Sequence, residues 1–137
     1  MKQANPEFYE KVKDYEKFSF EDLVKLEEEY KVGLLADGTK WPMVYHTSKM
    51  FISIFLYILG QEEKVNEAGI QIYSVHPGFI ETDLNTDMVK KNNLKPTETL
   101  EDGGNRLSYL AHLPFEIKPE LQGRHFEDDK ANDLKLE

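Results

Sequence analysis

The sequence contains no cysteine, so neither disulfide bonds nor thiolate chemistry are available to it. Its four histidines are scattered without the spacing of metal ligands, and we therefore expect no metal site. Positive charge is also scarce, because 17 basic residues face 26 acidic ones and leave a formal net charge of −9. That charge repels phosphate backbones and anionic lipid headgroups, so we expect neither nucleic acid nor a membrane surface as a partner.

Long hydrophobic runs are missing as well. The most apolar stretch, residues 50–59, is too short to span a bilayer, and the first residues have no apolar run of the kind found in a signal peptide. We therefore expect a soluble, cytoplasmic protein, and the lack of cysteine is compatible with a reducing compartment. What is present, 39% hydrophobic and 12% aromatic residues in a chain of 137, is enough to build a packed core.

Helical spacing dominates the first half of the sequence. Asn5-Pro6 predicts a helix to about Phe18, and a capping box at Ser19 to Asp22 predicts a second helix that ends at Gly33. After a loop rich in Gly and Pro, residues 43–60 predict a long helix that is apolar around most of its circumference. Such a helix must be buried on nearly all sides.

The second half predicts a mixture of strands and helices. A polar turn over residues 62–69 precedes the alternating pattern of residues 70–75, which predicts a strand that stops at His76-Pro77-Gly78. A helix followed by a strand indicates an α/β layer. The remaining expectations are a short helix capped near Thr82, a linker over 90–96, a helix over 97–113 weakened by Gly103-Gly104, a last strand over 123–127 and a charged tail over 128–137.

Tyr45 and Lys49 form the constellation most suited to chemistry. They are four residues apart on the predicted long helix, so both side chains lie on one face. A free phenol ionises near about pH 10, and a neighbouring ammonium favours the phenolate, which suits a proton donor working near neutrality. Tyr9 and Lys13 have the same spacing, but they lie in an acidic amphipathic segment with no strand behind it. We interpret that second pair as part of a solvated face.

The context of Tyr45 resembles the short-chain dehydrogenase/reductase family. In that family a Tyr-x-x-x-Lys helix is followed by a strand and a Pro-Gly-x-x-x-Thr loop, and here Tyr45-His46-Thr47-Ser48-Lys49 and Pro77 to Thr82 match that order. Within the family the sequence resembles the carboxyl-terminal half of the monomeric carbonyl reductases, in which a helical insertion before the catalytic Tyr covers a face that other members use to form dimers. Residues 5–33 with Trp41-Pro42 look like that insertion.

The resemblance implies an α/β fold: the carboxyl-terminal half of a Rossmann-like, doubly wound parallel sheet with a helical insertion before the catalytic helix. All of residues 1–137 would belong to this half domain. Its expected parts are the helical insertion (5–40), the catalytic helix, strand and Pro-Gly loop (41–83), the substrate-side helices and last strand (84–127) and the charged tail (128–137).

The resemblance also implies roles for individual residues. Tyr45 would protonate a carbonyl oxygen while hydride arrives from a reduced nicotinamide, and NADPH is expected rather than NADH. Phe79 and Trp41 would line the substrate pocket. The cofactor would be held by Tyr45, Lys49, Pro77, Gly78, Ile80 and Thr82. Ligands of open α/β sheets bind beyond the carboxyl ends of the strands, where the Pro77 to Thr82 loop is expected.

Two features of the family pattern have no counterpart in the sequence. None of the 8 glycines forms the Gly-rich turn that admits a pyrophosphate, and the family's catalytic Ser precedes the insertion. We therefore expect an amino-terminal half, or another protein chain, to cover the exposed strand and helix. The expected function is reduction of aldehydes, ketones or quinones to alcohols once that half is present. The alternative is a non-catalytic, reductase-derived structural subunit of a larger assembly.

Overall fold

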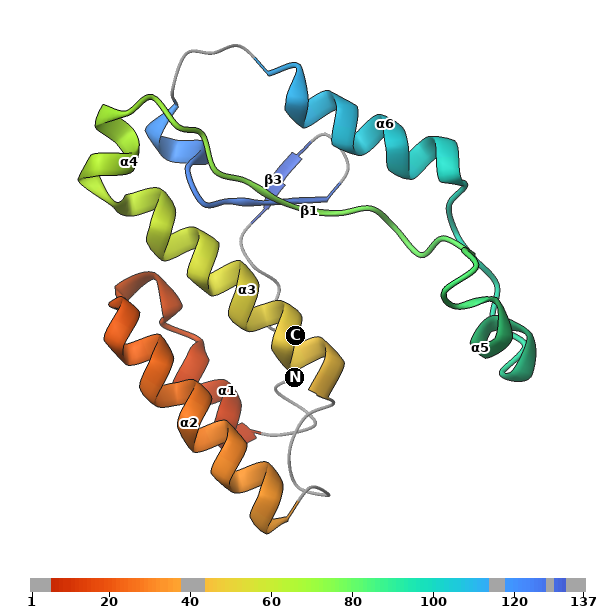
Figure 1. Ribbon diagram of the computed structural model, residues 1–137, viewed down its shortest axis with the longest axis horizontal. Coiled ribbons are helices and arrows are strands. Elements are labelled where there is room, and N and C mark those ends of the chain that lie inside the picture. Colours follow the sequence, from red (N-terminus) through yellow and green to blue (C-terminus); the bar gives the residue numbers. More distant parts are fainter. Residues whose placement is uncertain (1–5, 38–43, 114–117, 128–129, 133–137) are drawn as a thin grey trace.

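The computed structural model describes residues 6–37, 44–113, 118–127 and 130–132 (Figure 1). It is a mixed α/β structure, mostly helical, with a small sheet that contains one parallel pair of strands. All the elements described in the first half are helices, in the order α1 (Pro6–Val12), η1 (Tyr15–Lys17), α2 (Phe20–Ala36) and α3 (Val44–Gln61). The expected first helix is thus divided, because α1 ends at Val12 and a short 3-10 turn follows.

The second half alternates short helices with strands. It runs through α4 (Glu63–Glu67), β1 (Ser74–His76), α5 (Thr86–Lys91) and α6 (Leu100–Ala111). Two of these differ from expectation, since the polar turn over 62–69 contains α4, and α5 extends into the segment that was expected to be a linker. The chain continues with η2 (Pro119–Leu121), β2 (His125–Glu127) and β3 (Lys130–Asn132).

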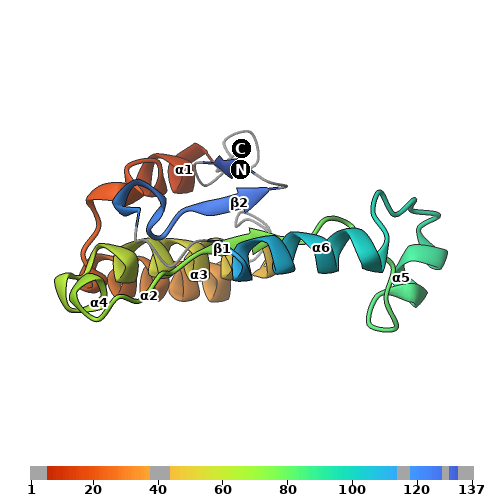
Figure 2. The ribbon, with the colours of Figure 1, turned by 90° about the horizontal axis from the view of Figure 1, so that it is seen from above.

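The sheet has the order β1-β2-β3, with β1 parallel to β2 and β3 antiparallel to β2. In Figure 1 β1 and β2 overlap, with α3 and α6 on opposite sides of them, whereas Figure 2 separates the two strands. Helices therefore flank both faces of the parallel pair. The expected charged tail is wrong in part, because residues 130–132 form a strand of this sheet.

Helix α2 begins where the capping box predicts. The Ser19 hydroxyl accepts a hydrogen bond from the Asp22 N–H at 3.2 Å, and the Asp22 carboxylate accepts one from the Ser19 N–H at 3.0 Å. The expected end at Gly33 is wrong, because the helix continues to Ala36. The Gly33 carbonyl accepts a hydrogen bond from the Asp37 N–H. Leu34, which packs against the core, explains why the helix tolerates a glycine here.

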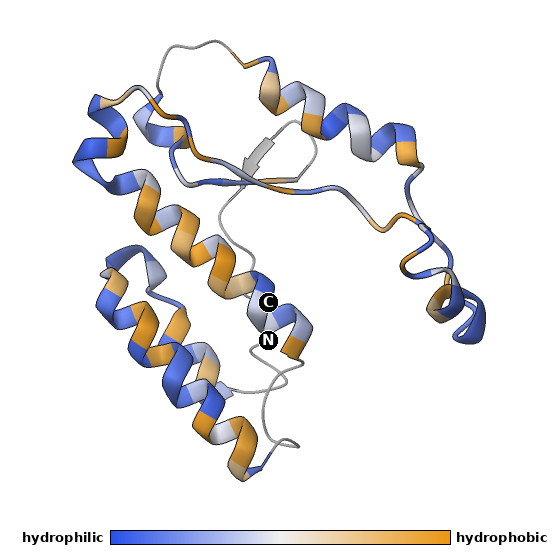
Figure 3. Ribbon diagram, viewed as in Figure 1, coloured by the Kyte–Doolittle hydropathy of each residue, from blue (hydrophilic) through white to orange (hydrophobic). Residues whose placement is uncertain are grey.

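The main core lies between α3 and the helices before it. Apolar side chains of α1, η1 and α2 contact one face of α3, and Figure 3 shows the hydrophobic residues gathered along these helices. Phe8 packs its ring against those of Tyr30 and Phe51 at centroid distances of 5.5 and 6.3 Å. The buried members of the cluster are Phe8, Val12, Tyr15, Leu23, Leu26, Tyr30, Met50, Ile54 and Ile58.

Helix α3 also approaches the turn before β2 more closely than side chains would allow. A Cβ added to Gly60 would lie 2.7 Å from the Gly123 nitrogen, and one added to Gly123 would lie 2.5 Å from the Tyr57 Cα. Gly123 has φ +72°, a backbone conformation that favours glycine in its own right. Two glycines thus let the helix and the turn pack backbone to backbone.

The strand before the Pro-Gly loop is shorter than the alternating pattern of 70–75 predicts. Over residues 70–72 the buried side chain of Gln122 takes the place of hydrogen bonds to a neighbouring strand. Its Oε1 accepts from the Ile72 N–H at 2.9 Å, and its Nε2 donates to the Ile70 carbonyl at 2.8 Å. Nε2 also donates to Asn66 Oδ1 at 3.0 Å. The segment is extended, but regular pairing with β2 begins only at Ser74.

Candidate functional site

Tyr45 and Lys49 lie one turn apart near the beginning of α3. Both side chains are exposed, Tyr45 to 67%, and the Lys49 ammonium lies 5.6 Å from the centroid of the phenol ring. This short separation follows from helical spacing, which places residues i and i+4 on one face. The His46 ring meets the Tyr45 ring edge-on at 5.6 Å. Across the described residues, no hydrogen bond engages the Tyr45 hydroxyl and no carboxylate pairs with Lys49.

The second Tyr/Lys pair differs in this respect. Tyr9 is half-buried and packs against the main core, while Lys13 is exposed and forms an ion pair with Glu10. The hydrogen bond from Lys13 to the Glu10 carboxylate raises the pKa of that ammonium. The positive charge beside Tyr9 is thus already matched, whereas no carboxylate among the described residues pairs with the one beside Tyr45.

A third phenol, Tyr73, lies immediately before β1 but is unsuited to proton transfer. Burial raises its pKa, its hydroxyl donates to Gln71 Oε1 at 2.7 Å, and its ring meets Phe126 edge-on at 5.3 Å. Burial disfavours the charged phenolate, and the hydrogen bond and the ring contact hold the side chain in place. Tyr73 is therefore a neutral phenol in a packing role.

The Pro77 to Thr82 segment leaves the carboxyl end of β1 as an internally bonded loop. Gly78 has φ +95°, and its N–H donates to His76 Nδ1 at 3.1 Å. The Thr82 N–H donates to Asn85 Oδ1 at 2.8 Å, and Asn85 Nδ2 donates back to the Ile80 carbonyl at 2.8 Å. Asn85 therefore closes the loop from the position just before α5.

Residues near α6 fix the other side of this loop. The Phe79 carbonyl accepts from the N–H groups of Thr97 and Glu98 at 3.0 and 3.2 Å. Glu98 pairs with Arg106 at 3.1 Å, and both side chains are largely shielded from solvent. A Cβ on Gly78 would lie 2.3 Å from Glu98 Cγ, so the ion pair packs directly on the glycine.

Gly103 allows α6 to lie against the same loop. A Cβ there would meet Ile80 Cδ1 at 2.3 Å and the Pro77 carbonyl oxygen at 3.2 Å. A glycine at this position is expected to weaken the helix, whereas in the structure it allows close packing. No local pattern in the sequence predicts the roles of Asn85, Glu98 and Arg106 in this loop.

The predicted site residues fall into two groups. Tyr45 and Lys49 lie at the beginning of α3, and Pro77, Gly78, Ile80 and Thr82 lie in the loop after β1. Because α3 and β1 run in opposite directions, both groups lie toward the same side of the molecule (Figure 1). No hydrogen bond or ion pair joins the two groups of described residues. Phe79 is half-buried within the loop, and Trp41 lies outside the described residues.

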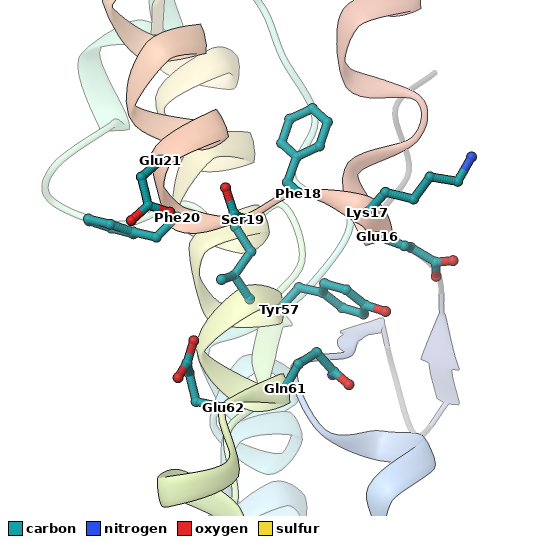
Figure 4. Close-up of a pocket in the computed structure, with 10 residues that line it drawn as sticks. Glu16, Lys17, Phe18, Ser19, Phe20, Glu21, Tyr57, Gln61 and Glu62 are labelled. Carbon is teal, nitrogen blue, oxygen red and sulfur yellow. The ribbon is translucent and has the colours of Figure 1, made fainter.

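Hollows open on the helical part of the molecule that the structure describes. An apolar groove of about 380 Å³ lies between α2 and α3 and reaches Ser48, next to Lys49. A more polar hollow of about 320 Å³ lies where η1 and α2 meet the end of α3. Figure 4 shows the rings of Phe18, Phe20 and Tyr57 pointing in different directions around it, so no common binding point is formed. Neither hollow is lined by the Pro-Gly loop.

The described part of the chain has neither a metal-binding cluster nor a membrane-spanning helix. No cluster of three or more His, Asp or Glu side chains there is arranged to hold a metal ion. No helix there has the length and apolar character needed to cross a membrane. In comparisons with known proteins, no protein-family model matches the sequence and no curated protein matches it significantly.

Proposed function

We propose that this chain supplies the proton donor of an NAD(P)H-dependent carbonyl reductase that converts aldehydes, ketones or quinones to alcohols. The observation that carries the proposal is the Tyr45–Lys49 pair: a solvent-facing phenol with an adjacent ammonium that no described carboxylate neutralises. Helix, strand and Pro-Gly loop follow one another as in the short-chain dehydrogenase/reductase family, and α3 and α6 flank both faces of the parallel pair. These features support the carboxyl-terminal half of a Rossmann-like, doubly wound domain as the finer fold.

In this proposal Tyr45 donates a proton from its hydroxyl to the carbonyl oxygen of the substrate. The Lys49 ammonium, 5.6 Å from the ring, stabilises the negative charge that remains on the phenol oxygen. The reduced nicotinamide, NADPH rather than NADH, supplies hydride when bound. Lys49 also fits the hydroxyls of its ribose, because an ammonium with no described acidic partner has its three N–H donors available.

The Pro77 to Thr82 loop would shape the cofactor site but offers it few unused hydrogen-bond donors. The N–H groups of Gly78 and Thr82 are used within the loop, so they are not available to a nicotinamide amide. The Thr82 hydroxyl lies 3.5 Å from Asn85 Oδ1, at the limit of hydrogen bonding, and is thus the donor most easily turned toward a ligand. Phe79 would line the substrate side, with Trp41 as a second aromatic wall.

The proposal requires an amino-terminal, nucleotide-binding half from outside residues 1–137 or from another chain. The sequence has no Gly-rich turn to admit a pyrophosphate closely. Among the described strands β1 pairs only with β2, so its other edge is open to a further strand. Such an edge supports a sheet that continues beyond this chain.

The test is NADPH-dependent reduction of a quinone and an aldehyde by the protein as isolated with any bound partner, whose mass is read by native mass spectrometry. Tyr45→Phe should reduce kcat by about 100-fold or more, which is the usual contribution of a general acid. Tyr9→Phe is the matched control, because it removes the hydroxyl of the other Tyr/Lys pair, and it should leave turnover unchanged.

Other outcomes would refute the proposal. Equal turnover by wild-type protein and Tyr45→Phe would show that the phenol is not the proton donor. A stable complex that neither binds NADPH nor turns over would instead identify a non-catalytic, reductase-derived structural subunit.

A further inference from the structure

His76 is the last residue of β1, and its ring accepts a hydrogen bond from the loop that follows the strand. The Gly78 N–H donates to His76 Nδ1 at 3.1 Å, and His76 itself is exposed to solvent. A backbone N–H can only donate, so Nδ1 must offer a lone pair and carry no proton. The loop as it stands in the structure therefore requires a neutral His76.

Protonation of the ring would break this hydrogen bond. A protonated imidazole carries a hydrogen on both nitrogens, and both nitrogens then act only as donors. At His76 the added hydrogen would face the Gly78 N–H, and two donors repel each other. Histidine is the side chain that ordinarily exchanges this proton between about pH 5 and pH 8. A modest change of pH near neutrality is thus enough to change the contact.

His112, another exposed histidine, has the opposite arrangement. Its Nδ1 lies 2.7 Å from the Ser108 carbonyl oxygen. A carbonyl oxygen can only accept, so this nitrogen carries the hydrogen and donates it. Protonation of the other ring nitrogen leaves that bond intact. Of the two rings, only that of His76 would lose its contact on protonation.

The other hydrogen bonds of the loop depend on groups that do not titrate near neutrality. The peptide N–H groups of Thr97 and Glu98 and the side-chain amide of Asn85 hold the middle and the end of the loop. The Glu81 carboxylate accepts from the Thr86 hydroxyl at 2.9 Å, but a carboxyl group ordinarily titrates near about pH 4. Among the hydrogen bonds that the described residues give this loop, the one to His76 is therefore the one that responds to pH near neutrality.

Charged groups lie on the elements packed against this bond. The Glu98–Arg106 ion pair encloses Gly78, since a Cβ there would meet Glu98 Cγ at 2.3 Å and Arg106 Nη1 at 2.6 Å. On β2, Glu127 is the register partner of His76. Carboxylate and guanidinium groups ordinarily stay charged between about pH 5 and pH 8, so the ion pair keeps Gly78 enclosed while the bond to His76 breaks. Loss of that bond then frees the N–H without displacing the glycine.

We propose that His76 is a pH-dependent latch on the Pro77 to Thr82 loop. Its neutral ring holds the Gly78 N–H, and its protonated ring releases that N–H as a donor for a ligand oxygen. The latch does not rest on the proposed function, because the loop amide alone reports it. In a carbonyl reductase of the proposed kind, the released donor would lie in the loop expected to hold the cofactor.

The test follows the exchange of the Gly78 amide hydrogen with water by NMR, in the full chain with any bound partner and with isotope-labelled glycine. The matched variant is His76→Asn. An asparagine two residues before an N–H accepts from it in an Asx turn, and an amide does not titrate, so this variant should hold the Gly78 N–H at every pH. Comparing the two proteins at one pH cancels the intrinsic pH dependence of exchange, because Pro77 and Gly78 are unchanged.

The expected result is a difference that appears only in acid. Near pH 8 the Gly78 amide should exchange equally fast in wild type and His76→Asn, whereas near pH 5 it should exchange about fivefold or more faster in wild type, the factor that loss of a typical hydrogen bond implies. His76→Phe has no acceptor and should show the faster exchange at both pH values. His112→Asn should behave as wild type. The Gly123 N–H, which donates to the Ile72 carbonyl at 2.9 Å, is the reference amide and should exchange equally in all four proteins.

Four results would overturn the proposal. Equal Gly78 exchange in wild type and His76→Asn at both pH values would show that the latch does not open. Equal exchange in His76→Phe and His76→Asn would show that the ring never held the N–H. Loss of the pH effect in His112→Asn would assign it to another group. A rise at Gly123 as large as that at Gly78 would reduce the effect to a general loosening of the chain in acid.

Discussion

Gln122 is the side chain whose loss should most clearly disturb the approach to the Pro-Gly loop. It is 3% exposed, and its amide makes three hydrogen bonds, to the Ile72 N–H, the Ile70 carbonyl and Asn66 Oδ1. The three bonds tie the segment before β1 to the turn before β2. Gln122→Leu keeps similar volume but removes all three.

The expected cost follows from the number of bonds. A typical internal hydrogen bond contributes about 1 kcal/mol net, so Gln122→Leu should lower the free energy of unfolding by about 3 kcal/mol. With a urea m-value of roughly 2 kcal/mol/M, the unfolding midpoint would fall by about 1.5 M. Urea titration followed by far-ultraviolet circular dichroism measures this shift.

Two further variants make the reasoning specific. Gln122→Glu keeps an acceptor for the Ile72 N–H but sets a buried carboxylate oxygen against two acceptors, the Ile70 carbonyl and Asn66 Oδ1, so it should lose at least as much stability as Gln122→Leu. Gln61→Leu removes one hydrogen bond from an exposed side chain to the Gln122 carbonyl and should cost less than about 1 kcal/mol. A midpoint for Gln122→Leu no lower than that of Gln61→Leu would refute the role assigned to the buried amide.

Further predictions concern neighbouring glycines and the helix caps. Gly103→Ala should lower the free energy of unfolding by about 1–3 kcal/mol, because its Cβ would overlap Ile80, whereas Gly104→Ala, with no atom within 4 Å, should raise it by roughly 0.5–1 kcal/mol. Equal urea midpoints for the two variants would contradict the close approach of α6. The pKa values of Asp22 and Asp102 are lowered by hydrogen bonds from their cap residues, Asp22 first by a backbone N–H and Asp102 first by a hydroxyl. Their contribution is present above the ordinary pKa of 3.8 and is lost as pH falls through the lower folded value, so an Asp22→Asn/Asp102→Asn variant should show a shallower loss of stability below about pH 4.

Local sequence signals predicted local structure well. The capping box at Ser19 and Asp22 is confirmed as the beginning of α2, and the spacing of Leu23, Leu26 and Tyr30 is confirmed as its buried face. These signals succeed because capping and periodicity depend on residues only three or four positions apart. Gly33 is the exception, because Leu34, the next residue, packs against the core and the helix continues to Ala36.

The candidate site could be predicted only in part, and for the same reason. Tyr45 and Lys49 are neighbours wherever that segment is helical, so the sequence suffices to pair them. The shape of the Pro-Gly loop depends on Asn85, Glu98 and Arg106, and the last two lie at least 16 residues beyond Thr82 with no local pattern to relate them to it. Whether Tyr45, Lys49 and the loop act together as a reductase site stays a prediction.

The sequence by itself determined the long helices α2 and α3, the capping box of α2 and the pairing of the phenol with the ammonium, since each follows from spacings within one or two helical turns, whereas the expected cap near Thr82 is wrong because α5 begins after Asn85. The tertiary structure decided which glycines serve close packing, where the pairing of β1 with β2 begins and which face of α3 the described residues leave exposed. Those features depend on contacts between segments as far apart as residues 60 and 123, whose close approach no local pattern encodes. The exposed apolar face of α3, which includes Ile52 and Phe55, is the clearest case, because its composition resembles that of the buried face and only packing distinguishes the two.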